Sequence, residues 1–138
     1  MTSTVVYEGG LRTVCEHLRS GSAIETDAPV DNNGKGERFS PSDLVATALG
    51  SCMLTIMGMR SETLNVDITG VKIEVEKFMK SEPRRISGIN LTFHFPDSLV
   101  LNEHQQQILQ KAAETCPVKY SIHPDIELNI NFNWAVLA

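Results

Sequence analysis

The segment FSPSDLVATALGSCMLTIMGMR, residues 39–60, constrains the fold more than any other part of the chain. Between Asp43 and Arg60 it carries no charge, and apolar residues occupy every side of the helix that it would form. Ser40 fits the N-cap position, Pro41 fits the first helical position, and Asp43 stands where an acidic side chain can complete a short capping box. A helix that is apolar on every side has to be covered on every side.

The length of the chain limits how much of this helix a single domain can cover. The 138 residues suit one domain, 1–138, because no linker, repeat or low-complexity tract divides them. One domain of this size has difficulty surrounding the helix alone, so we expect a second subunit to help. The uncharged run is also short for a membrane span, which needs about 20 predominantly apolar residues, and we expect no membrane association.

Alternating apolar and polar residues predict strands in other parts of the chain. Residues 4–18 predict a hairpin of two short strands that is broken at Gly9-Gly10, and residues 22–28 predict a third short strand. Apolar residues at every second position predict longer strands that each bury one face. This pattern occurs at residues 71–76, 89–95 and 126–134.

A second helix is expected after Asn102, which fits the N-cap position. Its apolar stripe runs to Cys116, and Pro117 ends or kinks the helix. Together with the strands, the two helices indicate an α+β fold. Cys52, in the middle of the first helix, and Cys116 are then expected to point into the same core.

Charge and cysteine content exclude several classes of function. The formal net charge is −5, the charges are mixed along the chain, and no basic stripe is present, so we expect no nucleic-acid partner. Cys15, Cys52 and Cys116 form an odd set without close spacing, which is not typical of a secreted disulfide framework. Because the start of the chain also lacks the pattern of a signal peptide, we expect a cytoplasmic location. The four histidines lack metal-ligand spacing, and we expect no metal or other cofactor.

The residues alone leave two interpretations of Cys52 and Cys116 open. Both can be small buried apolar side chains, which is a common fate of free cysteine. Alternatively, they form a redox pair that is distant in sequence and close in space. A thiol buried among apolar groups is inert, so a reactive Cys52 needs a cation nearby. The candidates, among which the sequence does not choose, are Arg12, Arg19, Arg38 and Arg60.

Two motifs carry a resemblance to a known family. FSPSDLVATALGSCM at residues 39–53 and AAETCPVKYSI at residues 112–122 resemble the OsmC/Ohr family of thiol-dependent peroxidases. The resemblance covers nearly the whole chain and implies an OsmC-like fold with antiparallel sheets around a central buried helix, in an intertwined homodimer. It also implies that Cys52 attacks an organic hydroperoxide and that Cys116 resolves the sulfenic acid as a disulfide. The implied reductant is a dithiol such as a lipoyl group.

The resemblance also concerns the cation that holds the thiolate. It implies that Arg12, which follows Gly9-Gly10, has this role. The family places a glutamate, paired with the arginine, directly after the proline of the helix start, but this chain has Ser42 there. Asp43 is one residue later and points about 100° away around the helix. This departure indicates a divergent subgroup.

Further expectations concern the pocket. An apolar peroxide needs apolar surroundings, which Leu49, Met53, Met57 and Phe39 are expected to supply. Two other functions remain open on the same dimer. In one, the pocket binds a small ligand without chemistry, and in the other, oxidation of Cys52 changes the packing of the dimer. Turnover separates them, because an enzyme consumes many equivalents of peroxide and a switch stops after one.

Overall fold

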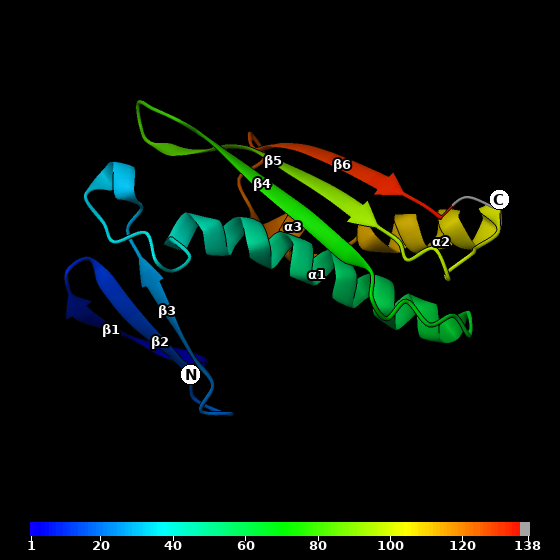
Figure 1. Cartoon of the computed structure of the whole chain (residues 1–138), viewed down its shortest axis with the longest axis horizontal. Helices are drawn as coiled ribbons and strands as arrows, with labels where there is room; N and C mark the ends of the chain where they lie inside the picture. Colours follow the sequence, from blue (N-terminus) through cyan, green and yellow to red (C-terminus); the bar gives the residue numbers. More distant parts are fainter. Residues whose placement is uncertain (136–138) are drawn as a thin grey trace. The chain divides into compact units, whose positions relative to one another are not determined.

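The computed structural model describes residues 1–135 and divides the chain into two compact units, Met1–Val45 and Ala46–Ala138. Each unit contains one three-stranded sheet, and the first helix begins in one unit and continues into the other (Figure 1). The elements are β1 Ser3–Gly9, β2 Arg12–His17, β3 Ala23–Asp27, a short 3-10 helix Val30–Asn32, α1 Pro41–Thr63, β4 Lys72–Lys80, β5 Arg85–His94, α2 Glu103–Ala113, α3 Pro117–Ser121 and β6 Glu127–Asn133. Mixed helices and strands confirm the predicted α+β class.

The first unit is an antiparallel sheet in the order β1-β2-β3. Its hairpin turns at Gly9 and Gly10, both with positive φ, as the sequence predicts. This unit has little apolar core of its own, because the buried side chains within residues 1–45 are all polar. They are Thr26, Asp27 and Ser40. By contrast, Val5, Tyr7 and Ile24 are at least half exposed, at 63%, 64% and 50%.

Reciprocal hydrogen bonds fix the start of α1. The backbone N–H of Asp43 donates to Ser40 Oγ at 3.1 Å, and the backbone N–H of Ser40 donates to Asp43 Oδ2 at 3.0 Å. These two bonds form a capping box with aspartate in place of the usual glutamate. The predicted helix start is therefore confirmed.

The second unit is a sheet in the order β4-β5-β6, with α1, α2 and α3 on one side of it (Figure 1). Strands β4 and β5 are antiparallel, but β6 pairs in parallel with β5. The sheet is thus mixed, which differs from the expected antiparallel arrangement. The reason is the connection: after β5 the chain passes through α2 and α3, and such a crossover returns it in the direction of β5.

Helix α1 buries one stripe against this unit. Leu49, Met53 and Met57 are spaced one turn apart and fully buried, in a core shared with β5. They therefore cannot line an open pocket, and that expectation is wrong for them, while Phe39 is 54% exposed. Within the described residues, α1 also has the length and hydropathy of a membrane span, as core helices of soluble proteins often do.

The second predicted helix ends earlier than expected. Asn102 and Gln105 form a capping box at its start, which confirms the predicted N-cap. Helix α2 then ends at Ala113, and Cys116 is the N-cap of a separate short helix, α3, whose first residue is Pro117. Proline at a first helical position lacks only a hydrogen bond that would be unmade there. Pro117 therefore starts a new helix and does not kink the previous one.

Candidate functional site

The thiols of Cys52 and Cys116 meet inside the second unit. Cys52 lies on α1 and is partly exposed, whereas Cys116 is fully buried before α3. The Cys116 Sγ atom accepts the backbone N–H of Lys119 at 3.2 Å. Burial raises the pKa of the Cys116 thiol, the neighbouring Cys52 thiol raises it further, and the Lys119 N–H offsets part of this effect. Cys116 is therefore held as a neutral thiol beside a more accessible one.

An apolar groove, which neither cysteine lines, runs between α1 and α2. Its volume is about 480 Å³. Ile56, on its wall, is one helical turn after Cys52, and Thr115 directly precedes Cys116. The lining residues are Ile56, Met59, Arg60, Thr63, Ile108, Lys111, Ala112 and Thr115. The groove could not be predicted from the sequence, because it depends on how two helices pack.

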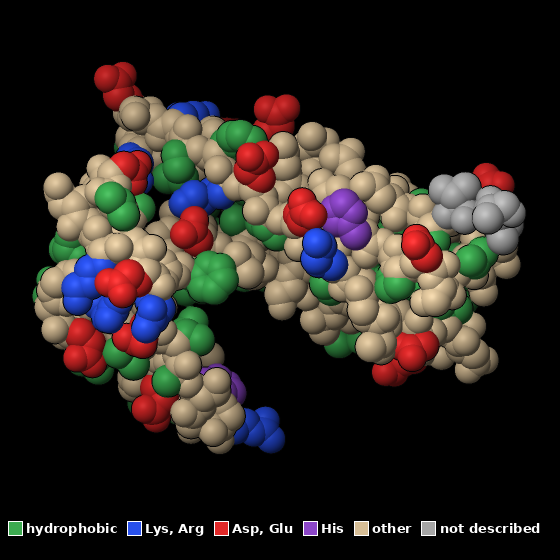
Figure 2. All heavy atoms as spheres, in the orientation of Figure 1, with side chains coloured by type: hydrophobic (Ala, Val, Ile, Leu, Met, Phe, Trp, Pro, Cys, Tyr) green, Lys and Arg blue, Asp and Glu red, His purple; other side chains and the backbone are tan. Residues whose placement is uncertain are grey.

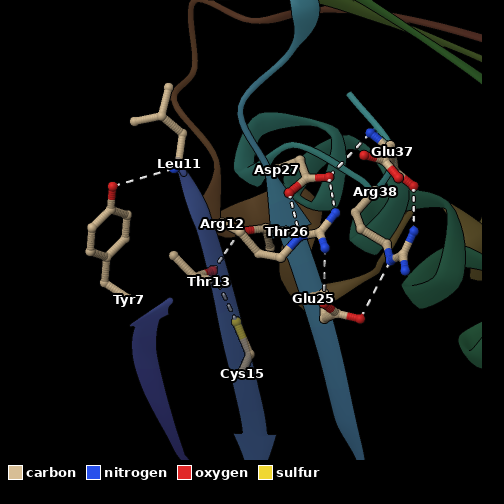
Figure 3. A network of polar contacts seen from close by, with 10 residues as sticks. All are labelled: Tyr7, Leu11, Arg12, Thr13, Cys15, Glu25, Thr26, Asp27, Glu37 and Arg38. Atoms are coloured by element: carbon tan, nitrogen blue, oxygen red, sulfur yellow. Dashed lines mark hydrogen bonds and ion pairs between the residues drawn. The ribbon is translucent and has the colours of Figure 1, made fainter. Parts of the chain in front are cut away.

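Arg12 lies in the first unit, where the carboxylate of Asp27 binds two nitrogen atoms of its guanidinium (Figure 3). Its Nε donates to Asp27 Oδ1 at 2.7 Å, and its Nη2 donates to Asp27 Oδ2 at 2.8 Å. Its Nη1 is 3.6 Å from Glu25 Oε2. These hydrogen bonds keep the pKa of Asp27 below its usual range and raise that of Arg12.

Asp27 is the residue of this network that the sequence did not predict. Its side chain is fully buried, and its Oδ2 also accepts the backbone N–H of Glu37 at 3.1 Å. Asp27 is the direct cross-strand neighbour of Arg12 in the register of β2 and β3. The available signal was an acid at the end of the predicted third strand, opposite an arginine that follows the hairpin turn.

The remaining candidates do not form a further site among residues 1–135. Cys15 lies 4.0 Å from Thr13 Oγ1, which in turn shares a hydrogen bond with Thr26. No group of three or more metal-ligating side chains occurs among the described residues. On the face shown in Figure 2, acidic and basic side chains are interspersed, as the sequence indicates.

The structure thus brings together two of the three predicted site residues. Cys52 and Cys116 meet within one unit, and Arg12 belongs to the other, where Asp27 fixes it. The fold and the thiol pair define an α+β protein with two interacting free cysteines. The family of OsmC-like proteins matches residues 34–131, and the chain belongs to this family.

A solved structure that is 48% identical supports this assignment, and two more distant ones share the fold. A candidate osmotic stress induced and detoxification response protein from Psychrobacter arcticus 273-4 is 48% identical, with 96% of each chain covered and a TM-score of 0.92. An organic hydroperoxide resistance protein OsmC from Legionella pneumophila is 18% identical, with 96% and 97% covered and a TM-score of 0.73. The organic hydroperoxide resistance protein OhrB of Bacillus subtilis is 17% identical, with 96% and 98% covered and a TM-score of 0.65. Comparison with curated proteins gave no match.

Proposed function

We propose that the protein is a thiol-dependent peroxidase that reduces organic hydroperoxides. The observation that carries this proposal is the meeting of Cys52 and Cys116 with unequal exposure. A partly exposed thiol can reach a substrate, and a buried thiol beside it can trap the first oxidation product. Membership of the OsmC-like family and likeness to proteins named for organic hydroperoxide resistance support the same function.

The chemistry has three balanced steps. The Cys52 thiolate attacks the terminal oxygen of the hydroperoxide, the O–O bond breaks, and an alcohol leaves after taking up a proton. The Cys116 sulfur then attacks the Cys52 sulfenic acid, which releases water and forms a disulfide. A dithiol reductant, such as a lipoyl group in a reducing cytoplasm, exchanges with that disulfide and leaves as a cyclic disulfide. Both protein thiols are restored.

Arg12 has an electrostatic role in this proposal. Only the thiolate is a strong nucleophile, so a cation beside Cys52 is needed to favour it at neutral pH. Arg12 remains charged at every physiological pH. Its side chain is 18% exposed, so it is not fully enclosed by its partners. The apolar groove between α1 and α2 favours a substrate with a hydrocarbon body over hydrogen peroxide.

We also propose that the working unit is a homodimer. The sheet of the first unit exposes Val5, Tyr7 and Ile24 and buries no apolar side chain of its own. A three-stranded sheet needs a packed apolar face for stability. On α1, Met59 is 60% exposed although the helix is apolar nearly throughout. A second chain would cover both surfaces, and sedimentation showing a folded monomer at micromolar concentration would exclude it.

Intact mass after one equivalent of organic hydroperoxide tests the proposed chemistry. Wild type should lose two hydrogens as the disulfide forms. Cys116→Ser should instead gain oxygen on Cys52, and under excess peroxide it should advance to the sulfinic acid. Cys52→Ser should consume no peroxide, while Cys15→Ser serves as the matched control and should behave as wild type. If wild type forms no disulfide, both thiols are core residues and the proposal fails.

A second function is favoured by the groove itself. A protein with Ser42 in place of the family glutamate could bind a small apolar ligand in this groove without turnover. Steady-state kinetics with a dithiol reductant decides between the two functions. Many equivalents of hydroperoxide consumed per chain support the peroxidase. A single equivalent indicates a redox switch, and binding without consumption indicates a ligand carrier.

A further inference from the structure

We propose that the dithiol reductant attacks the sulfur of Cys52 in the disulfide, so that Cys116 is the leaving group. This inference rests on the proposed peroxidase function and fixes the direction of its reductive step. A disulfide offers two sulfur atoms to a thiolate, and exchange at one or the other releases a different thiol. Cys52 and Cys116 both lie within the second unit, Ala46–Ala138.

Access to the two sulfur atoms is unequal. Cys52 is partly exposed on α1, whereas the side chain of Cys116 is 0% exposed. Cys116 belongs to the hydrophobic core, in which Leu109 and Ala113 are also fully buried. The rate of exchange depends on the access of the attacking thiolate to the sulfur with which it reacts. A dithiol can therefore reach Cys52 from solvent, but it can reach Cys116 only after this part of the core opens.

The leaving group has an effect in the opposite direction. Burial raises the pKa of the Cys116 thiol, and a thiol of higher pKa leaves more slowly. This effect only slows the exchange at Cys52. Attack on Cys116 instead requires the core to open, which in a packed core costs up to the whole stability of the fold. Access therefore outweighs the leaving-group effect.

The backbone beside Cys116 offsets part of this slowing. The Cys116 Sγ atom accepts the backbone N–H of Lys119 at 3.2 Å. A hydrogen bond to an ionised acceptor is stronger than one to a neutral acceptor, so this bond strengthens as Cys116 leaves as a thiolate. The Nζ atom of Lys119 donates instead to the carbonyl of Glu114 at 3.3 Å. The backbone of Lys119, and not its ammonium group, is thus the partner of the sulfur.

Exchange at Cys52 restores both thiols in two steps. A thiolate of the reductant attacks Cys52 Sγ, the S–S bond breaks, and its electron pair goes to Cys116, which then takes up a proton. The reductant is now joined to Cys52 as a mixed disulfide. Its second thiolate attacks its own bound sulfur, which closes the cyclic disulfide and releases Cys52 as a thiolate. Cys52 is thus the site of both half-reactions.

A monothiol captures the first of these steps, because it has no second thiol with which to complete the reduction. Protein that carries Cys15→Ser is oxidised with one equivalent of cumene hydroperoxide, exposed briefly to N-acetylcysteine, quenched with acid and alkylated with N-ethylmaleimide under denaturing conditions. Peptide mass should place N-acetylcysteine on Cys52 and the maleimide on Cys116, in at least about tenfold excess over the reverse. Equal amounts, or an excess of the reverse product, would overturn the proposal.

Oxidation with diamide separates this inference from the function on which it rests. If the hydroperoxide forms no disulfide, the proposed peroxidase fails. Diamide joins two thiols without a peroxide, and the same mapping then decides which sulfur the monothiol attacks. If diamide does not join Cys52 and Cys116 either, the inference fails as well.

Two substitutions of Lys119 test the role of its N–H group. Lys119→Pro removes this group in the first turn of α3, where proline is tolerated, and the matched control Lys119→Ala keeps it while removing the ammonium group. Reduction of the disulfide by dithiothreitol should be about tenfold slower in Lys119→Pro than in Lys119→Ala, because a hydrogen bond to a charged group is lost. Equal rates would refute the role of the N–H group. The mapping of the adduct does not depend on these variants, and it decides the direction of attack if Lys119→Pro does not fold.

Discussion

Gly50 tests how closely α1 has to approach the sheet that supports Cys52. A Cβ atom added at Gly50 would lie 3.1 Å from Val75 Cγ2 and 3.5 Å from Leu91 Cδ2. Gly58, in the same helix, has no neighbouring atom within 4 Å of the same position. Gly50→Ala and Gly58→Ala therefore make the same chemical change in two different surroundings.

Both substitutions gain the helix propensity of alanine, but only Gly50→Ala adds a methyl group to a packed core. Alanine in a helix interior is about 1 kcal/mol more favourable than glycine, so Gly58→Ala should stabilise the protein by about that amount. Gly50→Ala gains the same term, but an extra methyl in a packed core typically costs about 1–3 kcal/mol. The net effect at Gly50 should lie between about zero and 2 kcal/mol of lost stability. The difference between the two variants isolates the packing cost.

Urea unfolding of both variants at one protein concentration provides the assay, because the stability of the proposed dimer would depend on concentration. The free energies of unfolding should differ by about 1–3 kcal/mol, with Gly58→Ala the more stable. Gly50→Ala should also form the Cys52–Cys116 disulfide more slowly, since the helix has to shift two residues before Cys52. If both variants gain the same stability within about 0.5 kcal/mol, the close approach at Gly50 is not needed and the reasoning is wrong.

Three further predictions concern the core and the titrating groups. Leu109 is fully buried, so Leu109→Ala should lose about 2–5 kcal/mol in urea unfolding, and a loss below about 1 kcal/mol would contradict its place in the core. The raised pKa and burial of Cys116 predict that iodoacetamide modifies Cys52 first, as measured by peptide mass, and equal rates would argue against this. Because Arg12 keeps the pKa of Asp27 below its usual 3.8, this pair stabilises the fold above that pH, and its contribution is lost as pH falls through the lower folded value. Asp27→Asn should therefore show a smaller drop in unfolding free energy than wild type between about pH 5 and pH 2, and an equal drop would contradict the assignment.

The sequence by itself determined the features that depend on neighbouring residues. The start of α1 follows from Ser40, Pro41 and Asp43, because capping uses donors and acceptors only a few residues apart. The hairpin at Gly9-Gly10 also follows from local backbone preferences. Strands with one buried face were visible because side chains alternate with a period of two.

Only the tertiary structure decided which distant residues meet. The parallel pairing of β6 depends on the path through α2 and α3, which no local pattern encodes. The end of α2 at Ala113 was also missed, because the apolar stripe continues to Cys116 although that residue caps the next helix. Asp27 reaches Arg12 because the register of β2 and β3 places them opposite each other. Register and crossing geometry arise from packing over the whole chain, and so the partner of a site residue is not written beside it in the sequence.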